Sequence, residues 1–480
     1  MSGPIIRLFG LIVVLFALLI GWTSRWTVFE ASSLNNNQLN RRTLIDEQRI
    51  KRGQIIADDG TVLARSVPAP GQIWTRFYPT RSLFAQPVGY AIVEFGRSAG
   101  LERSRGPELR GLQTGLGSVF GQLGGSQRVG DDVDTTLDPK AQQVATVQLQ
   151  SASQIGSPKG SVVALNPRTG AVLVMAALPS YDDNRPDATG PTTSTFNRST
   201  QAGYPPGSTF KVLTAVAAID SGKFTPSSTV NGNSPVTISG VPLSNDGNQS
   251  FGTIDLTTAL TFSVNTVWAQ VAETVGRQTM TDYMRRFGFY SKPPLDYPPD
   301  ELNASRPYAP NGRPYAPGSP NEDIGRIGIG QGGLQVTPLQ MAMVASAVAN
   351  NGKLMVPHLT SRVVDQDGRT AQTIKPSTYA QVMKPSTAQA VGQMMTHVVQ
   401  EGTGTAAALT GITVAGKTGT ASVGVAGANV TQPWFIAFAP VQNPQVAIAV
   451  TVERTQGGFG GTVAAPIAKA VMQTLLAEGK

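Results

Sequence analysis

The stretch SVVALNPRTGAVLVMAAL, from Ser161 to Leu178, consists of two apolar runs on either side of a polar centre. Asn166, Pro167 and Gly170 provide the residue types that turns favour. Short apolar runs bounded by turn residues predict two adjacent buried β-strands. The preceding stretch, DPKAQQVATVQLQSA, has the composition of a helix. Together these segments predict the start of an α/β body.

The C-terminal end repeats this pattern. WFIAFAP and PQVAIAVTVE are two β-rich runs, and the segment from Ala464 to Glu478 places Ile467, Val471 and Leu475 on one helical face. We therefore expect a terminal strand pair with a helix packed against it.

Composition excludes several kinds of site. The chain has no cysteine, which rules out disulfides, thiolate metal sites, iron–sulfur clusters and cysteine nucleophiles. His358 and His397 are far apart and match no zinc pattern, so we expect no metal site. The net charge is +8, but no Lys/Arg run concentrates it. This favours a basic surface near anionic lipid or wall polymer, and we expect no nucleic-acid binding.

The N-terminus carries one strongly apolar segment. Residues 8–22, LFGLIVVLFALLIGW, are uncharged, and with residues 5–7 they are about long enough to cross a bilayer. Trp22 and Trp26 lie where an aromatic belt would be. The segment ends in GWTSRW rather than in a small-residue cleavage site, which predicts an uncleaved signal anchor. One arginine on each side leaves its orientation open.

At 480 residues the chain is long enough for about three units, or two and an anchor. We expect a cytoplasmic tip and anchor at 1–26, a non-catalytic pedestal at 27–132 and a catalytic body at 133–480. The pedestal contains strand-like pieces such as GQIIADDGTVLA between Gly/Pro/Ser/Arg-rich stretches. The Pro/Tyr/Asn/Gly-rich segment 291–320, with RPYAP twice, predicts a surface loop.

Two glycine motifs match nucleotide-binding patterns. Residues 411–418, GITVAGKT, fit G-x-x-x-x-G-K-[ST], but that loop must be followed by a helix, and TGTASVG continues as strand. GIGQGG, from Gly328 to Gly333, fits G-x-G-x-x-G, yet no buried strand precedes it and no acidic residue follows about twenty positions on. We interpret the second as a tight loop beside an active site.

Ser208 and Lys211 form the first candidate catalytic pair. Pro and Gly at 205–207 mark a helix start, which places Ser208 in the first turn. Lys211 follows three residues later on the same face, so its amine can reach the hydroxyl as a base. A serine three residues before a lysine also arises by chance, and the pair alone is weak support.

Two further boxes make the pattern specific. Ser263-Val264-Asn265 lies in an amphipathic segment, and Lys417-Thr418-Gly419-Thr420 lies on a predicted strand. S-x-x-K, S-x-N and K-T-G in this order are the motif set of serine β-lactamases and penicillin-binding proteins. Val264 departs from the S-D-N form of the middle box, but both functional side chains remain.

The resemblance extends beyond the boxes. RGQIIADDG, GLE, LNPRTGAVLVMAALPSYDDN, YPPGSTFK, GIGQGGLQVTPLQMA, ANNGKLMVPH and GKTGTA all resemble class B, or monofunctional, penicillin-binding proteins, and they cover nearly the whole chain. The resemblance implies an α/β (α+β) fold of the penicillin-binding/β-lactamase kind. It would have an antiparallel five-stranded sheet flanked by helices, an elongated β-rich pedestal of dimerisation-domain type and one transmembrane helix.

It also implies a serine-type D-Ala-D-Ala transpeptidase that cross-links peptidoglycan stem peptides through an acyl-serine and is inhibited by β-lactams. Ser208 would attack the penultimate D-Ala carbonyl, with Lys211 as base. Burial and the charge of Lys417 would lower the Lys211 pKa. The remaining expected roles are proton relay for Ser263, substrate amide binding for Asn265, carboxylate binding by Lys417, Thr418, Gly419 and Thr420, and an oxyanion hole from the backbone N–H groups of Ser208 and Thr420. No cofactor is expected.

Three alternatives stay open. A β-lactamase shares the boxes, but class A enzymes use a glutamate-activated water, and Glu301-Leu302-Asn303 lacks the E-x-x-L-N spacing because position 299 is proline. A D,D-carboxypeptidase would use the same residues with water as acceptor. An idle β-lactam-binding sensor or divisome scaffold would not need every motif side chain.

The family likeness also implies a location and partners. We expect a single-pass protein of the cytoplasmic membrane with its catalytic body outside the cytoplasm. The expected role is in cell division and septal wall synthesis, with a SEDS-family glycosyltransferase and other divisome proteins as partners.

Overall fold

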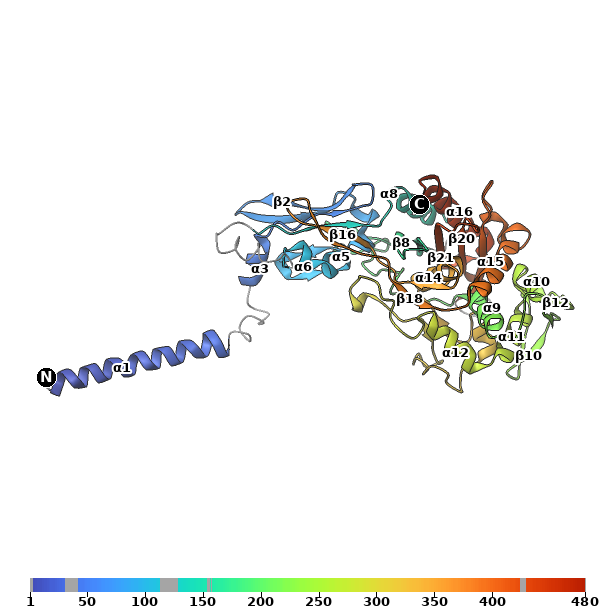
Figure 1. Cartoon of the computed structure of the whole chain (residues 1–480), viewed down its shortest axis with the longest axis horizontal. Coiled ribbons are helices and arrows are strands. Elements are labelled where there is room, and N and C mark those ends of the chain that lie inside the picture. The colour runs from blue at the N-terminus through green and yellow to red at the C-terminus, as the bar shows by residue number, and fades with distance from the viewer. Residues whose placement is uncertain are drawn as a thin grey trace.

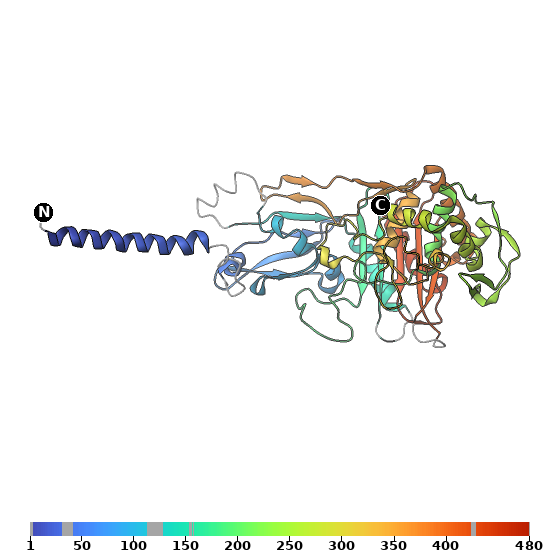
Figure 2. The same ribbon diagram turned by 90° about the horizontal axis from the view of Figure 1, so that it is seen from below.

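The computed structural model describes residues 3–30, 42–112, 128–152, 156, 158–423 and 429–479. Figures 1 and 2 show an elongated molecule. A single N-terminal helix lies at one end, a strand-rich unit in the middle, and a larger unit of helices around a sheet at the other end.

The N-terminal helix α1 (Gly3–Ser24) is apolar on all sides and continues into a π-helical turn, η1 (Arg25–Phe29). Residues 3–27 have a mean hydropathy of 2.6 over their best window, and none of that window is buried against the rest of the protein. At 1.5 Å per residue, 22 residues span about 33 Å, close to the hydrocarbon thickness of a bilayer. The helix is long and apolar enough for one membrane span.

A six-stranded sheet, which we call the pedestal sheet, forms the middle unit. Its order is β17-β16-β6-β1-β2-β3. The bounds are β1 (Ile55–Ile56), β2 (Val62–Ala69), β3 (Ile73–Phe77), β6 (Asp132–Thr135), β16 (Thr360–Val364) and β17 (Thr370–Thr373). Val133 pairs in parallel with Ile55 on one side and antiparallel with Val363 on the other. A hairpin from late in the chain therefore completes a sheet that the N-terminal segment begins.

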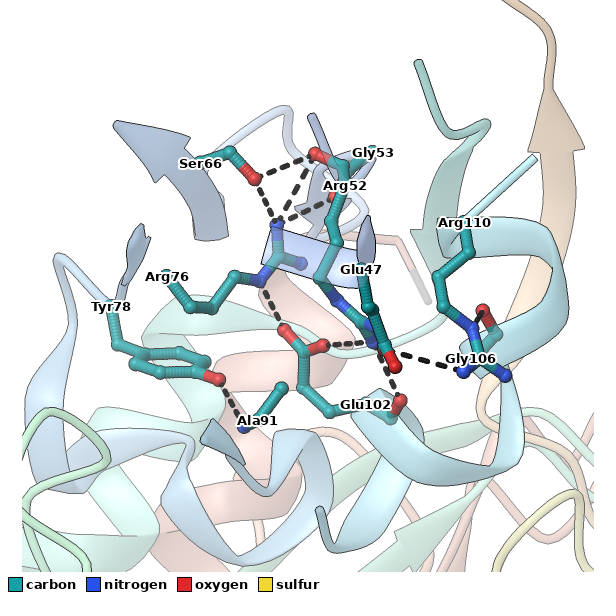
Figure 3. Close-up of polar contacts among 10 residues, drawn as sticks. All are labelled: Glu47, Arg52, Gly53, Ser66, Arg76, Tyr78, Ala91, Glu102, Gly106 and Arg110. Carbon is teal, nitrogen blue, oxygen red and sulfur yellow. Dashed lines mark hydrogen bonds and ion pairs between the residues drawn. The ribbon is translucent and has the colours of Figure 1, made fainter. Parts of the chain in front are cut away.

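Short helices carry a buried ionic cluster against this sheet (Figure 3). Glu102, on α5 (Gly100–Ser104), is fully buried and accepts hydrogen bonds from Arg76 Nε and, at 2.8 Å, from Arg52 Nη2. Arg76 Nη1 also donates to the Gly53 carbonyl at 2.7 Å. Burial disfavours the charged carboxylate, but Arg76 and Arg52 outweigh burial and lower the pKa of Glu102 below its ordinary value. The cluster ties α5 to strand β3 and to the segment that leads into β1.

The catalytic body is built on an antiparallel sheet of order β19-β20-β21-β7-β8, with β22 paired to the end of β20. The bounds are β7 (Gly160–Leu165), β8 (Val172–Leu178), β19 (Ala415–Ser422), β20 (Val430–Ala439), β21 (Val446–Val452) and β22 (Thr455–Gln456). The five main strands confirm the expected five-stranded sheet, and β7 and β8 are the predicted pair.

Both faces of this sheet are covered by helices. Trp434, Ile436 and Phe438 of β20 belong to one buried cluster, whereas Phe435 and Ala437 belong to another. The alternation follows from the two-residue period of a strand. The first face packs on α14 (Pro338–Ala349) and α15 (Pro385–Gln400), and the second on α8 (Pro139–Ser151) and α16 (Ala465–Ala477). This double burial explains why β8 and β21 are apolar along almost their whole length.

Helices and small hairpins complete the body around the sheet. The main elements are α9 (Lys211–Asp220), α10 (Leu256–Thr261), α11 (Asn265–Val275), α12 (Arg277–Arg286), α13 (Ile324–Gly328), β9 (Thr229–Asn231), β10 (Val236–Ile238), β11 (Val241–Leu243), β12 (Thr253–Asp255), β13 (Arg306–Pro307), β14 (Leu334–Gln335), β15 (Lys353–Met355) and β18 (Thr378–Gln381). Of these, α9, α10, α11, β10 and β12 lie at the end far from α1 (Figure 1). The shorter N-terminal elements are α3 (Arg42–Gln48), α4 (Ala85–Val88), α6 (Gly106–Leu109), β4 (Ala91–Ile92) and β5 (Arg97–Ser98).

α8 and α16 confirm the predicted helices. The segment 291–320 is mostly turn and loop, with only β13 and a short 3-10 turn, η6 (Pro299–Glu301). β19 continues from Lys417 to Ser422, so no helix follows the GITVAGKT pattern. The chain therefore lacks the strand–loop–helix context of a phosphate loop at that position.

Candidate active site

Ser208 lies on a 3-10 turn, η4 (Gly207–Phe210), and α9 begins only at Lys211. The prediction of a first α-helical turn is therefore wrong in detail. Gly207 has a positive φ of 52°, and its N–H donates to the Gly330 carbonyl at 3.1 Å. A β-carbon on Gly330 would lie 2.0 Å from the Gly207 carbonyl oxygen. The GIGQGG segment thus packs against the turn that carries Ser208, as expected for a tight loop beside the site.

The strand β19 packs against the same turn from another side. A β-carbon on Gly207 would lie 2.9 Å from the Thr420 carbonyl oxygen, and one on Gly419 would lie 2.7 Å from that of Pro206. Only glycine permits such close backbone approach. The arrangement brings the backbone of Ser208 next to that of Thr420, the two residues expected to form the oxyanion hole.

Lys211 is fully buried and joins the first two boxes. Its Nζ donates to the Ser263 carbonyl at 2.7 Å, to Ser263 Oγ at 3.3 Å and to Asn265 Oδ1 at 2.7 Å. Ser263 lies in the turn between α10 and α11 with a positive φ of 61°, which aims both its carbonyl and its hydroxyl at the lysine. Among the described residues, Ser208 is not a hydrogen-bond partner of Lys211 in this arrangement.

Lys417 provides a second buried amine. It is fully buried, and its Nζ donates to the Thr418 carbonyl at 3.0 Å. Burial lowers the pKa of Lys417 to about 7. Burial lowers the pKa of Lys211 well below its ordinary value, and the charge of Lys417 lowers it further, whereas Asp246 acts in the opposite direction. Both amines are therefore held where the neutral form is accessible.

The two threonines of the third box have different partners. Thr418 Oγ1 lies 2.6 Å from Thr403 Oγ1, and Thr420 Oγ1 accepts a hydrogen bond of 3.2 Å from the Gly460 N–H. Thr403, Gly460 and Asp246 were not singled out from the sequence. The sequence signals for Thr403 and Gly460 were the glycine-rich stretches EGTG and GGFGG in which they lie, because close backbone packing requires glycine.

The structure therefore assembles the candidate residues from three separate segments, 208–211, 263–265 and 417–420. They form a site for nucleophilic acyl transfer. It consists of a serine on a tight turn, a buried lysine between a second serine and an asparagine, and the K-T-G strand beside them. The backbone N–H groups at 208 and 420 can stabilise an oxyanion.

Known proteins share this organisation along the whole chain. A family profile described as the penicillin-binding protein transpeptidase domain matches residues 160–473. A second profile, the penicillin-binding protein A dimerisation domain, matches residues 52–133. The chain is 34% identical to the peptidoglycan D,D-transpeptidase PbpA of Mycolicibacterium smegmatis, with 100% of both chains covered. It is 32% identical to PbpA of Mycobacterium tuberculosis over 99% of each chain.

Solved structures of penicillin-binding proteins are similar to this chain in fold as well. Penicillin-binding protein A from M. tuberculosis, as a ceftriaxone acyl-enzyme complex, superposes with a TM-score of 0.80 at 31% identity, covering 90% of this chain and 100% of that one. Its penicillin G acyl-enzyme complex gives a TM-score of 0.78, covering 89% and 99%. Because the transpeptidase profile spans residues 160–473 and the PbpA relatives match along the full length, the chain belongs to the class B penicillin-binding proteins.

Proposed function

We propose that this protein is a peptidoglycan D,D-transpeptidase that uses Ser208 to form an acyl-enzyme with the D-Ala-D-Ala end of a stem peptide. The observation that carries the proposal is the fully buried Lys211 amine, which bridges Ser263 and Asn265 one helical turn from Ser208. The names of the PbpA relatives and the acyl-enzyme complexes of penicillin-binding protein A support it.

In the first half-reaction, neutral Lys211 takes the Ser208 hydroxyl proton as Oγ attacks the penultimate D-Ala carbonyl. The oxyanion is stabilised by the N–H groups of Ser208 and Thr420. The C–N bond to the terminal D-Ala then breaks, and Ser263 relays the proton from Lys211 to the leaving amine, so that Lys211 is neutral again. In the second half-reaction, an amine from a neighbouring stem attacks the ester, and the Ser208 hydroxyl is restored as the cross-link forms.

The other boxes bind the substrate. Asn265 Nδ2 lies at the start of α11, where it can donate to the substrate backbone once Oδ1 is held by Lys211. Lys417 with Thr418, Gly419 and Thr420 binds the terminal carboxylate. β-Lactams have a strained amide in place of the D-Ala-D-Ala bond, so the same attack leaves a slowly hydrolysed ester on Ser208.

The position of Glu301 argues against the β-lactamase alternative. Its carboxylate accepts hydrogen bonds from the Gly100 N–H at 3.2 and 3.3 Å and forms an ion pair of 3.6 Å with Arg103. Gly100 and Arg103 both belong to the pedestal. A glutamate engaged there does not activate a hydrolytic water at Ser208, which favours slow deacylation.

The membrane arrangement and partners follow from the same proposal. The apolar helix α1 anchors the chain once in the cytoplasmic membrane, and the catalytic body lies outside the cytoplasm, where peptidoglycan is cross-linked. A SEDS-family glycosyltransferase and other divisome proteins are the partners that we propose for septal synthesis. Cross-linking of the full chain in membranes, followed by mass spectrometry of the linked peptides, tests for them; linked peptides from wall-unrelated proteins alone would contradict this assignment.

Intact mass after incubation with penicillin tests the nucleophile. We expect one penicilloyl group on the full-length wild type and on Ser221→Ala, which removes an exposed hydroxyl at the end of α9, but none on Ser208→Ala. An adduct on Ser208→Ala would contradict the assignment. Rapid drug hydrolysis without an adduct would identify a β-lactamase, and neither adduct nor hydrolysis would identify an idle scaffold.

Release of D-Ala from a stem pentapeptide tests the reaction itself. We expect release together with a cross-linked dimer when a second stem supplies its amine. Release with water as the only acceptor would identify a D,D-carboxypeptidase.

A further inference from the structure

Tyr204 lies four residues before Ser208, and its side chain is held by groups that the mechanism above does not use. The residue is 8% exposed. Its hydroxyl donates to Glu453 Oε1, a carboxylate just beyond the end of β21. Burial, followed by the charge of Glu453, raises the pKa of Tyr204 well above its ordinary value, so the hydroxyl keeps its proton as a hydrogen-bond donor.

Glu453 is fixed by a second partner. Arg198 Nε donates to the same Oε1 atom at 2.8 Å, and the side chains of Arg198 and Glu453 are only 13% and 17% exposed. The Glu453 backbone N–H also donates to the Lys159 carbonyl at 2.9 Å, next to β7. The Tyr204 hydroxyl is therefore hydrogen-bonded to a carboxylate whose backbone follows β21 and is also attached to the residue before β7.

The Tyr204 ring packs against β20, the strand paired with the K-T-G strand β19. Its ring meets that of Trp434 edge-to-face, with centroids 6.2 Å apart. Trp434 pairs with Gly419 in the register of β20 and β19. The Tyr204 ring thus rests on the strand that flanks the box expected to bind the substrate carboxylate and to supply an oxyanion-hole N–H.

The backbone connects Tyr204 to the nucleophile through a stiff segment. Tyr204 exchanges two hydrogen bonds with Val336, at 2.9 and 2.8 Å, and Gly207 donates to Gly330. Only Pro205 and Pro206 lie between these two attachments, and a proline fixes φ near −65°. A shift at Tyr204 is therefore passed to Ser208 rather than absorbed by the chain between them.

We propose that Tyr204, held by Glu453 and Arg198, is a positioning residue that sets the Ser208 turn against β19, so that the nucleophile and the Thr420 N–H face the same carbonyl. The inference rests on the proposed function, because it concerns the acylation of Ser208. Tyr204 touches no reacting atom in this role. Its hydroxyl acts through Glu453 and the sheet.

The test compares two buried tyrosine–carboxylate pairs. Tyr283 donates to Asp220 Oδ2 at 2.6 Å and is also buried, but Asp220 ends α9, whereas Ser208 precedes its start. Tyr204→Phe and Tyr283→Phe each remove one hydroxyl and keep the ring. We expect both to lower the Tm of the full-length protein to a similar extent. Only Tyr204→Phe should lower the acylation rate at saturating β-lactam, by about tenfold, with the dissociation constant of the non-covalent complex unchanged.

Equal acylation rates in the two variants would overturn the proposal, as would a change confined to the dissociation constant. The outcome is separable from the proposed function. If the wild type is not acylated, the proposed function fails. If the wild type is acylated and Tyr204→Phe is acylated at the same rate, only the inference fails.

A double-variant cycle tests the route through the carboxylate. If Tyr204 acts through Glu453, then Glu453→Gln should slow acylation about as much as Tyr204→Phe, and the double variant should be no slower than either. Multiplied losses in the double variant would mean that the two side chains act independently, which contradicts a single positioning cluster.

Discussion

Asn265 Oδ1 lies 2.7 Å from Lys211 Nζ, so the first residues of α11 and α9 meet through one hydrogen bond in the site. The amide is neutral, and the amine is fully buried with Lys417 as a nearby positive charge. Replacing the amide with a carboxylate of the same shape would change the charge next to the amine without changing the packing. This relationship gives a direct test of Lys211 as the base.

Asn265→Asp should shift the pH dependence of acylation to higher pH. Acylation requires neutral Lys211, so the rate rises as pH increases through the Lys211 pKa, which lies below 10.5 in the wild type. An adjacent carboxylate stabilises the ammonium and therefore raises the Lys211 pKa. The measurement is the midpoint of the rate–pH curve with a chromogenic β-lactam; Asn443→Asp, in a surface loop, is the control. An unmoved midpoint would mean that Lys211 is not the titrating base.

Gly330→Ala should abolish most acylation, and Gly368 provides a control of the same backbone conformation. Both glycines have a φ of 76°, so alanine strains the backbone at both positions. At Gly330 the new β-carbon would lie 2.0 Å from the Gly207 carbonyl oxygen, whereas at Gly368 it would meet nothing within 4 Å. Displacement of the Ser208 turn should then cost about 100-fold in acylation rate.

Gly368→Ala should lose only about 1 kcal/mol of stability and acylate normally. Comparable acylation by the two variants would show that the GIGQGG segment does not hold the nucleophile in place.

Much of the body could be predicted because its signals are local. The runs that form β7, β8, β20 and β21 are apolar on both faces, which happens when helices cover both sides of a sheet. The three catalytic boxes were found for a similar reason, since each keeps its residues within four positions. Their order along the chain was enough to group them.

What the sequence did not reveal depends on distant partners. Val363 pairs with Val133 to complete the pedestal sheet, although no local pattern links the two segments. Glu102 was noted only as part of GLE, and its partners Arg52 and Arg76 emerge from the folded arrangement. The turn at Ser263 has a positive φ without glycine, a conformation that composition does not predict.

Glu102→Gln should lower the free energy of unfolding while having little effect on the acylation of Ser208. The variant leaves two arginines at a buried site without their carboxylate, which costs about 3–5 kcal/mol. Asp134→Asn, which breaks the exposed pair with Arg362, should cost less than about 1 kcal/mol. Urea unfolding of the full-length variants measures both. Similar losses would mean that the Glu102 cluster is not a major source of stability.

The same group predicts a pH dependence of stability. The folded-state pKa of Glu102 is lowered from 4.5, so its stabilisation is fully present above pH 4.5 and is lost as pH falls through the lowered value. The difference in unfolding free energy between wild type and Glu102→Gln should therefore be constant near neutral pH and shrink below pH 4.5. A difference that grows on acidification would contradict the ionic account.

Glu301→Gln should weaken the contact with the pedestal without changing the lifetime of the acyl-enzyme. The Glu301 carboxylate accepts the Gly100 N–H and pairs with Arg103, and burial raises its pKa. Gln loses the ion pair with Arg103, but the raised pKa means that burial already disfavours the charged carboxylate, so the net loss of stability should stay below about 1 kcal/mol. The half-life of the penicilloyl adduct, followed by intact mass, should stay within about twofold of wild type, because no water activated by Glu301 contributes to deacylation. A clearly longer adduct lifetime would instead assign Glu301 to deacylation and revive the β-lactamase alternative.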